Sequence, residues 1–272
     1  MAHILVAGLG DLGSALACDW LAAGHQVSGI RRGSEAPAGV DLYSQDLCRD
    51  PLQLPPDQVD LLYIIMTPAS RDEAGYRDAY LTAPARLLDA LSARQPLPPV
   101  VFVSSTAVYG DHGGEPDEHS EPRPDGFNGR ILLAAEQEVS LRTLATAVRF
   151  SGIYGPGRER LLNQVRRLQA GDAAPTPQWS NRIHSEDCVG LLRRVGAGWL
   201  NGDMQWPVVV GTDLMPVLNV AVLNWISERT GSPLNLFEPD IAPGKRIRSR
   251  FIAEGNYQLR YPDYRSGYDT LL

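Results

Sequence analysis

The sequence predicts an α/β protein with a parallel central sheet and a small C-terminal lobe. Through the first 150 residues, apolar runs bounded by turn residues alternate with helical periods. A glycine-rich turn directly follows the first apolar run, and stretches dense in proline and glycine interrupt the alternation from residue 111 onward. Strands that alternate with helices need crossover connections, and such connections place the strands in parallel.

The elements follow in chain order from the period of the apolar residues. Buried runs bounded by glycine, proline or aspartate predict strands at residues 3–8, 26–30, 40–43, 59–66, 100–105, 145–150, 181–185 and 204–211. Apolar residues three and four apart predict helices at residues 12–23, 80–93, 130–141, 161–168, from 187 onward, and 217–230. The remaining C-terminal stretch is expected to be irregular.

The turn GLGDLG has the spacing G-x-G-x-x-G between the first strand and the first helix. Its first glycine permits a tight turn, the second lets the backbone approach a pyrophosphate, and the third lets helix and strand pack closely. The helix N-terminus offers N–H groups to phosphates. We therefore predict a Rossmann-type, doubly wound dinucleotide-binding domain whose phosphate site is made by Gly8, Leu9, Gly10, Asp11, Leu12 and Gly13.

Two arginines follow the second strand and bear on the choice of nucleotide. An NAD site usually places a carboxylate here for the ribose 2′-hydroxyl, whereas Arg31 and Arg32 can pair with a 2′-phosphate. NADP is favoured, and NAD stays open because exposed arginines also stack on adenine without discriminating. Asp46 and Leu47 fit an adenine-contacting loop. Thr67, Pro68 and Ser104, at later strand ends, are also expected to contact the cofactor.

Composition points to a small-molecule partner. The chain has 272 residues, is 43% hydrophobic and carries a formal net charge of -7, which disfavours general affinity for nucleic acid or an acidic membrane. No basic leader precedes the first strand and no apolar stretch is long enough to span a bilayer, so a cytoplasmic location is expected. The three cysteines lie far apart, and no metal site is expected.

The domain boundaries follow from the same pattern. Residues 1–150 are expected to form the dinucleotide-binding domain and residues 151–272 an interleaved substrate lobe. Segments near 181–184 and 205–211 are expected to return to the sheet domain, because both have the apolar pattern of a buried strand.

The chain resembles the extended short-chain dehydrogenase/reductase superfamily, in its NAD-dependent epimerase/dehydratase branch. Besides GLGDLG, the resemblance rests on FVSSTAVYGD, RFSGIYGPGR, NRIHSEDC and PVVVGTD, each at the expected place in the βα order. It implies that Ser105, with Thr106 beside it, holds the reacting oxygen, and that Ser151, Gly152 and Ile153 line the nicotinamide. It also implies a helix-pair homodimer.

The chain departs from this family at the helix that begins near Arg130. The family carries Y-x-x-x-K there, in which lysine holds the nicotinamide ribose and lowers the tyrosine pKa. Here Asn128 and Leu132 stand at those places, and the only lysine is Lys245. Arg130 can contact the ribose or a phosphate but cannot act as an acid or base. The pattern looks like an atypical subgroup of the superfamily whose members carry an S-G-R or S-G-K helix start, where this chain has Asn128, Gly129 and Arg130.

Another group must then handle the proton if the protein turns over a substrate. Tyr109, Tyr154 and His184 are the nearest candidates, of which Tyr154 and His184 join Ser105 and Thr106 as the expected catalytic residues; structural roles stay open for each. We expect an NADP-favouring oxidoreductase that acts on a small carbonyl or hydroxyl compound. The alternatives are a non-catalytic NAD(P)-sensing regulator, and an isomerase or dehydratase with tightly held cofactor.

Overall fold

The computed structural model describes all residues, Met1–Leu272, and the chain divides into two compact units. Unit 1 comprises Met1–Gly110, Pro122–Arg149 and Val189–Val209. Unit 2 comprises Asp111–Glu121, Phe150–Cys188 and Val210–Leu272. The division is therefore more interleaved than a single boundary at residue 150, because the loop 111–121 belongs to unit 2 and residues 189–209 belong to unit 1.

A seven-stranded sheet, with strand order β10-β6-β5-β4-β1-β2-β3, organises unit 1. β1 pairs in parallel with both β2 and β4, and the pairs β2–β3 and β4–β5 are parallel as well. All five residues of β1 are buried, which explains its unbroken apolar run. The prediction of a Rossmann-type parallel sheet is confirmed. The strands are β1 His3–Ala7, β2 Gln26–Arg31, β3 Asp41–Ser44, β4 Leu61–Ile64, β5 Val100–Ser105, β6 Ala145–Phe150 and β10 Val208–Gly211.

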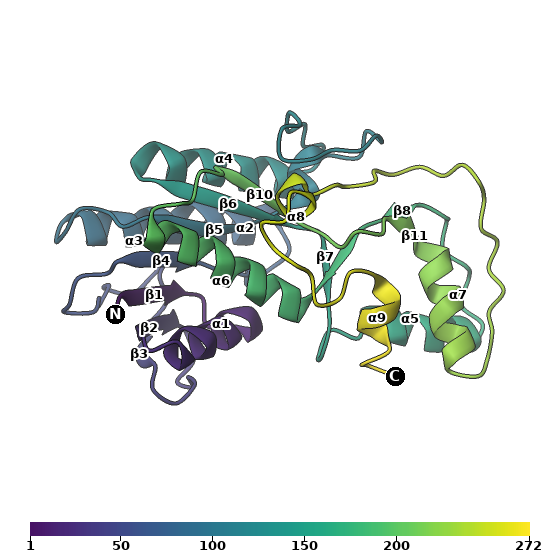
Figure 1. Cartoon of the computed structure of the whole chain (residues 1–272), viewed down its shortest axis with the longest axis horizontal. Helices are drawn as coiled ribbons and strands as arrows, with labels where there is room; N and C mark the ends of the chain where they lie inside the picture. Colours follow the sequence, from purple (N-terminus) through teal and green to yellow (C-terminus); the bar gives the residue numbers. More distant parts are fainter. The chain divides into compact units, whose positions relative to one another are not determined.

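Helices cover both faces of this sheet (Figure 1). α1 (Asp11–Ala22) and α6 (Ser185–Asn201) lie on one face, and α3 (Ala83–Ser92) and α4 (Phe127–Arg142) lie on the other. The helix predicted at 80–93 is longer than expected: α2 (Glu73–Arg77) continues through a π-helical turn, η1 (Asp78–Thr82), into α3. Single π turns inside helices often occur at functional sites.

Unit 2 has two small sheets and four helices. β7 (Gly152–Tyr154) pairs in parallel with β9 (Arg182–His184), and β8 (Trp179–Ser180) pairs antiparallel with β11 (Val217–Leu218). Of the two segments expected to return to the sheet domain, the one near 181–184 forms β9, whose partner is β7. The segment 205–211 does contribute β10 to the large sheet.

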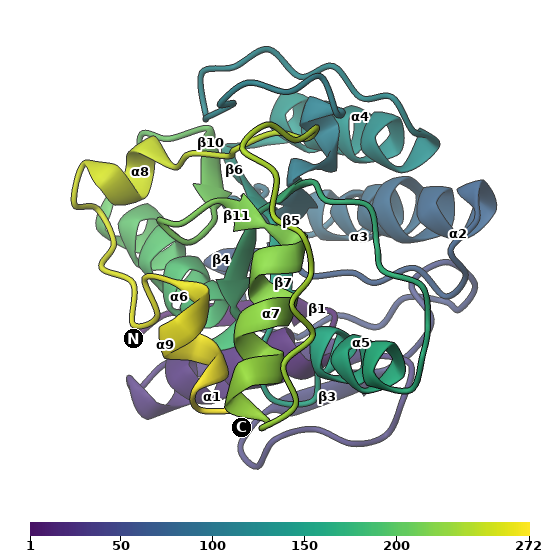
Figure 2. The same cartoon turned by 90° about the vertical axis from the view of Figure 1, so that its right-hand side faces the viewer.

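The helices of unit 2 share one apolar core. α5 (Arg160–Gln169), α7 (Asn219–Arg229) and α9 (Tyr264–Tyr268) bury Val165, Leu223 and Tyr268 against one another, and Figure 2 shows α7 between α9 and α5. The tail is less irregular than expected, since it contains α8 (Arg250–Ala253) and α9. The side chains of Ser249 and Asp263 cap these two short helices.

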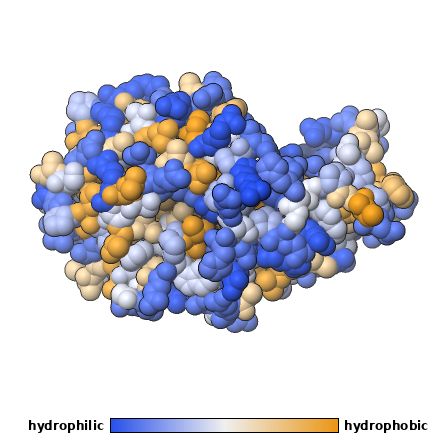
Figure 3. All heavy atoms as spheres, turned by 90° about the horizontal axis from the view of Figure 1, so that it is seen from above, coloured by the Kyte–Doolittle hydropathy of each residue, from blue (hydrophilic) through white to orange (hydrophobic).

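The surface is mixed in character. Apolar residues are scattered among hydrophilic ones on the face shown in Figure 3, as expected where most large apolar side chains are in the core. None of the helices combines the length and the apolar composition needed to cross a membrane.

Candidate functional site

Unit 1 contains a cavity of about 500 Å³ at the carboxyl ends of β1 to β4. The cavity is lined by the glycine turn, by the segments that follow β2, β3 and β4, and by residues of α2 and η1. Open α/β sheets bind ligands in this crevice where the strand order reverses, which here is between β1 and β4. The predicted residues that line the cavity are Gly8, Leu9, Gly10, Arg31, Arg32, Asp46, Leu47 and Thr67.

The three glycines of the turn have separate geometric roles. Gly8 has φ +107°, and a Cβ there would lie 2.0 Å from the carbonyl oxygen of Ile65. A Cβ at Gly13 would lie 2.1 Å from the carbonyl oxygen of Gly8. At Gly10, which lines the cavity, a Cβ would meet nothing within 4 Å. The turn therefore leaves room at Gly10 that suits a phosphate group.

The N-terminus of α1 adjoins this open position. Gly10 is the N-cap residue, and no side chain caps the helix. Asp11, Leu12 and Gly13 form its first turn without lining the cavity. Because first-turn N–H groups and the helix dipole favour an anion, the geometry fits the pyrophosphate of a dinucleotide.

The end of β2 places two guanidinium groups at the cavity. Arg31 is half-buried and donates from Nη1 to the carbonyl oxygen of Glu35 at 2.9 Å, and Arg32 is exposed. No carboxylate stands at this strand end, where the sequence continues with Gly33. The two arginines can therefore pair with a phosphate, and no carboxylate at the end of β2 accepts a hydrogen bond from a ribose hydroxyl.

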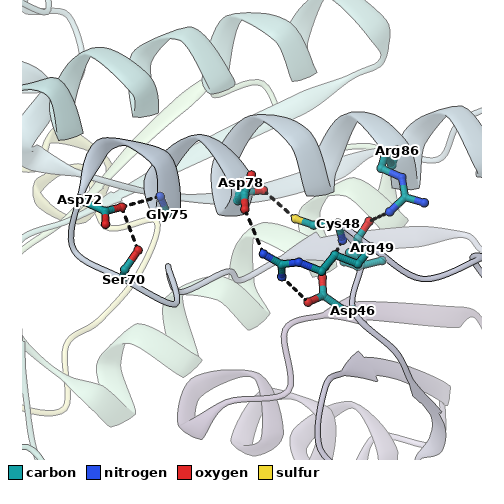
Figure 4. Close-up of polar contacts among 9 residues, drawn as sticks. Asp46, Cys48, Arg49, Ser70, Asp72, Gly75, Asp78 and Arg86 are labelled. Atoms are coloured by element: carbon teal, nitrogen blue, oxygen red, sulfur yellow. Dashed lines mark hydrogen bonds and ion pairs between the residues drawn. The ribbon is translucent and has the colours of Figure 1, made fainter.

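The segment after β3 is fixed to η1 by polar contacts (Figure 4). Arg49 lies 2.8 Å from Asp46 and 3.6 Å from Asp78. Burial raises the pKa of Asp46, but hydrogen bonds from the Cys48 N–H and from Arg49 outweigh it and hold that pKa below its usual value. The thiol of Cys48 donates to the carbonyl oxygen of Asp78 at 3.2 Å, and burial raises its pKa, so it stays protonated.

The loop after β4 completes the cavity. Thr67 lines it, whereas Pro68 does not. The Ser70 hydroxyl donates to Asp72, which also accepts the N–H of Gly75 and caps α2; both contacts are 2.8 Å (Figure 4). Sequence reasoning missed Arg49, Ser70, Asp72 and Asp78 as lining residues. The Asp72 cap, three residues before Gly75, was a signal for an earlier start of the helix.

The serines at the end of β5 have different surroundings. Ser105 caps the short helix η2 (Thr106–Tyr109), since its hydroxyl accepts the N–H of Ala107 at 3.2 Å. Thr106 is buried at the start of η2. The Ser104 hydroxyl donates to Glu136 of α4 at 2.5 Å, and none of these three side chains lines the cavity.

Ser104 belongs to a buried polar network of unit 1. Arg149 and Glu136 form an ion pair of 2.6 Å with side chains only 5% and 7% exposed, and Arg149 also donates to the Tyr109 hydroxyl at 3.0 Å. Burial opposes the charge of Arg149, but the bonds to Glu136 prevail and raise its pKa. Ser104 and Tyr109 therefore have a structural role in this network, which links β5, β6, η2 and α4.

Helix α4 presents no phenol or amine in its first turns. Asn128 is half-buried and Leu132 is buried. Gly129 has a packing role, because a Cβ there would lie 2.5 Å from the carbonyl oxygen of Ala107. Arg130 is exposed and donates to the carbonyl oxygen of Asp125 at 2.6 Å, and it does not line the cavity.

The remaining predicted residues lie in unit 2. Ser151 precedes β7, whose first two residues are Gly152 and Ile153. Tyr154 is buried and stacks on Tyr268 with ring centroids 4.5 Å apart. Burial raises its pKa, which disfavours ionisation of the phenol.

His184 is also buried, and burial lowers its pKa, so it is neutral at physiological pH. Its Nδ1 accepts the N–H of Glu186 at 3.3 Å. These surroundings do not support the expected roles of Tyr154 and His184 in proton transfer.

The comparison with family models gives one match over most of the chain. Residues 4–214 match the model of the NAD dependent epimerase/dehydratase family. The curated protein YeeZ of Escherichia coli (strain K12) is 33% identical over 207 residues, which are 71% of this chain and 72% of YeeZ.

Solved structures share the fold over nearly the whole chain. A Methylobacillus flagellatus protein assigned to the NAD-dependent epimerases/dehydratases is 32% identical, with a TM-score of 0.82 over 99% of this chain and 97% of its own. The protein MoeE5, in complex with UDP-glucose and NAD, is 23% identical, with a TM-score of 0.79 over 98% and 97% of the two chains. The chain thus belongs to the NAD-dependent epimerase/dehydratase family and is an NAD(P)-binding protein of the oxidoreductase type.

Proposed function

We propose that this protein is an oxidoreductase of the epimerase/dehydratase type that favours NADP over NAD and acts on a small carbonyl or hydroxyl compound. The observation that carries the proposal is the cavity of about 500 Å³ in which the glycine turn and the pair Arg31 and Arg32 meet. A guanidinium can pair with a 2′-phosphate, and the strand end carries no competing carboxylate.

The residues of this cavity fit the nucleotide end of the cofactor. The open space at Gly10 and the uncapped start of α1 suit the pyrophosphate, and Asp46 and Leu47 suit the adenine. When bound, the nicotinamide supplies or accepts the hydride. The chain's own part is to bind and orient the two reactants.

Ser105 and Thr106 are the residues that we propose to hold the reacting oxygen. The family resemblance supports this role, together with that of Ser151, Gly152 and Ile153 at the nicotinamide. Ser104 and Arg130 were expected at the cofactor, but their observed hydrogen bonds lead elsewhere, so they are not part of the proposal. UDP-glucose is a ligand of MoeE5, a chain that this one covers to 97%, so chain length does not separate a small substrate from a nucleotide sugar.

The nucleotide preference is tested by calorimetric titration with NADPH, NADP, NADH and NAD. We expect the phosphorylated forms to bind at least ten times more tightly, and Arg31→Asp to abolish the difference. Arg77→Asp is the matched control, because Arg77 is exposed and does not line the cavity. Equal affinity for all four nucleotides in the unaltered protein would contradict the NADP preference.

Turnover is tested separately with a panel of small aldehydes and ketones. Oxidation of NADPH that slows at least ten-fold in Ser105→Ala, with nucleotide affinity unchanged, is the expected result. A rate that Ser105→Ala leaves unchanged would remove Ser105 from the reaction.

A second candidate is a non-catalytic protein that senses the nicotinamide pool. The observation in its favour is that α4 carries Asn128 and Leu132 in place of the tyrosine and lysine. A sensor must bind a protein partner differently with and without nucleotide. Identical pull-down profiles in the presence and absence of NADPH would argue against this candidate.

A third candidate is an isomerase or dehydratase in which hydride leaves and returns to a tightly held cofactor. Such a protein consumes no NADPH, so it would be silent in the panel above. Denaturing the purified protein and measuring the released nucleotide by chromatography tests it, and near-stoichiometric nucleotide is the expected result. Homodimerisation remains a proposal from the family resemblance, to be tested by light scattering.

A further inference from the structure

Unit 2 buries four side-chain atoms that have no hydrogen-bond partner. They are Ser151 Oγ, Arg182 Nη1, His184 Nε2 and Asp213 Oδ2, and the four residues are 7%, 5%, 0% and 1% exposed. Buried polar groups are nearly always paired, because an unpaired one loses its hydration without compensation. Several such atoms in one part of a molecule indicate that something else supplies their partners.

The backbone brings these residues together from three segments. Gly152, the neighbour of Ser151, is paired in register with Arg182. The N–H of Asp213 donates to the carbonyl oxygen of Arg182 at 2.7 Å, and the N–H of Ser151 donates to the carbonyl oxygen of Gly211 at 2.9 Å. The residues thus surround the junction of β7, β9 and the end of β10 within unit 2.

Arg182 and His184 lie on the same face of β9, because alternate residues of a strand point to the same side. Tyrosines cover this face. The guanidinium of Arg182 lies 5.7 Å from the ring centroid of Tyr264, and the imidazole of His184 is 4.0 Å from that of Tyr261. Each of the two polar groups therefore packs against an aromatic ring.

Both strand residues present a donor. His184 Nδ1 accepts the N–H of Glu186, so the proton of the neutral ring is on Nε2. Arg182 uses Nη2 to donate to Ser180 Oγ at 2.7 Å, which leaves Nη1. Asp213 uses Oδ1 to accept the N–H of Met215 at 3.1 Å, which leaves Oδ2.

Asp213 lies near one cation, Arg182, and two carboxylates, Asp187 and Asp263. Burial raises the pKa of Asp213 to about 7, against the opposing effect of Arg182, so its carboxyl is partly protonated near neutral pH. When it is protonated, it leaves the charge of Arg182 without a counter-charge from Asp213. The carboxylates Asp187 and Asp263, which accept backbone N–H groups, also act on Asp213, and the phenols of Tyr154 and Tyr268 face the same cluster. Glu186, Asp187 and Arg260 act on His184, and Arg160 acts on Tyr268.

We infer that unit 2 binds a small organic carboxylate, to which Arg182 Nη1 and His184 Nε2 donate. A carboxylate offers two oxygens to these unpaired donors, and a charged donor such as Arg182 makes the stronger hydrogen bond to it. Ser151 adds a hydroxyl that can donate to the same ligand. If the carboxylate is part of the substrate, which rests on the proposed function, the substrate class is a small oxo or hydroxy acid.

The test is calorimetric titration of the whole protein, without nucleotide, at pH 6 and pH 8. The probes are pyruvate and benzoate, each compared with its neutral amide, pyruvamide and benzamide. We expect at least one carboxylate to bind at least ten times more tightly than its amide at pH 6. Its affinity should fall about ten-fold at pH 8, because the protonated fraction of a carboxyl with a pKa of about 7 falls by that factor.

Two variants assign the site. Asp213→Asn should keep carboxylate binding and remove its pH dependence, while Arg182→Gln should weaken it at least ten-fold. The control Arg167→Gln changes an exposed arginine of α5 and should have no effect. Unaltered affinity in Arg182→Gln, or amides that bind as well as carboxylates, would overturn the inference, and internal water would then be the partner of these atoms. The comparison of carboxylates with amides uses the unaltered protein, so it tests the inference even if Arg182→Gln misfolds.

The inference and the proposed function fail in distinguishable ways. NADPH oxidation with neutral carbonyl compounds and no carboxylate binding would refute the inference and leave the oxidoreductase proposal standing. Carboxylate binding in a protein that binds none of the four nucleotides would do the reverse.

Discussion

Each unit buries a set of polar side chains, and the two sets differ in how they are paired. In unit 1, Ser104, Glu136, Arg149 and Tyr109 bond to one another. In unit 2, Ser151, Arg182, His184 and Asp213 each retain an atom without a partner. A buried network whose polar atoms are all paired stabilises the fold by itself. A buried network with unpaired atoms destabilises the fold until a ligand supplies their hydrogen-bond partners. Burial alone therefore does not distinguish structural from functional polar residues. The presence or absence of hydrogen-bond partners does distinguish them.

The largest loss of stability is expected from breaking the paired network of unit 1. Arg149→Met leaves Glu136 buried without its partner, which should lower the free energy of unfolding by about 3–5 kcal/mol. Urea unfolding measures this. Arg142→Met is the matched control, since its ion pair with Asp89 is more exposed and should contribute about 1 kcal/mol or less. Equal losses in the two variants would remove the distinction between them.

The next effect concerns Asp213, whose pKa is raised to about 7 in the folded protein from roughly 3.9 in the unfolded chain. Between these values the folded state holds a proton that the unfolded state has lost. This contribution to stability is therefore complete below about pH 4 and is lost as pH rises to 7, by up to about 1.4 kcal/mol per unit.

Asp213→Asn should remove this dependence and stabilise the ligand-free protein at pH 8 by roughly 2–4 kcal/mol. Urea unfolding between pH 4 and pH 8 is the measurement, with the exposed Asp203→Asn as control. Parallel pH profiles of the unaltered protein and Asp213→Asn would show that the carboxyl is ionised in the fold.

The smallest effects come from a matched pair of serines. Ser104→Ala removes a hydrogen bond to a charged group and should cost about 1.5–3 kcal/mol. Ser151→Ala removes a hydroxyl without a partner and should change stability by about 0.5 kcal/mol or less. Thermal unfolding of both variants compares them directly. A larger loss in Ser151→Ala would mean that its hydroxyl is paired in the protein.

Much of the fold could be predicted from the sequence, because its signals are local. The strand period, the glycine spacing of Gly8, Gly10 and Gly13, and the helix after it each depend on neighbours in the chain. The partner of β9 could not be predicted, since a three-residue strand fits either sheet equally well. The helices α8 and α9 were missed because they are only four and five residues long, although their caps Ser249 and Asp263 were visible in the sequence.

The cavity at the carboxyl ends of β1 to β4 was predicted in part, and the polar cluster of unit 2 was not. Strand ends identified Arg31 and Asp46, but Arg49 lies at the cavity because of its ion pairs across to η1. The cluster around Arg182 and Asp213 depends on which residues become buried together from distant segments. That information is tertiary and has no short-range pattern in the sequence.

The interleaving of the two units also bears on how the chain is made. β6 has β5 on one side and β10 on the other, and β10 is synthesised only after much of unit 2 has left the ribosome. For the seconds that this takes, the nascent chain has an unpaired strand edge at β6, and such edges recruit other strands. A protein of this topology is therefore most exposed to aggregation while it is being translated, and slower elongation through residues 151–207 would prolong the danger.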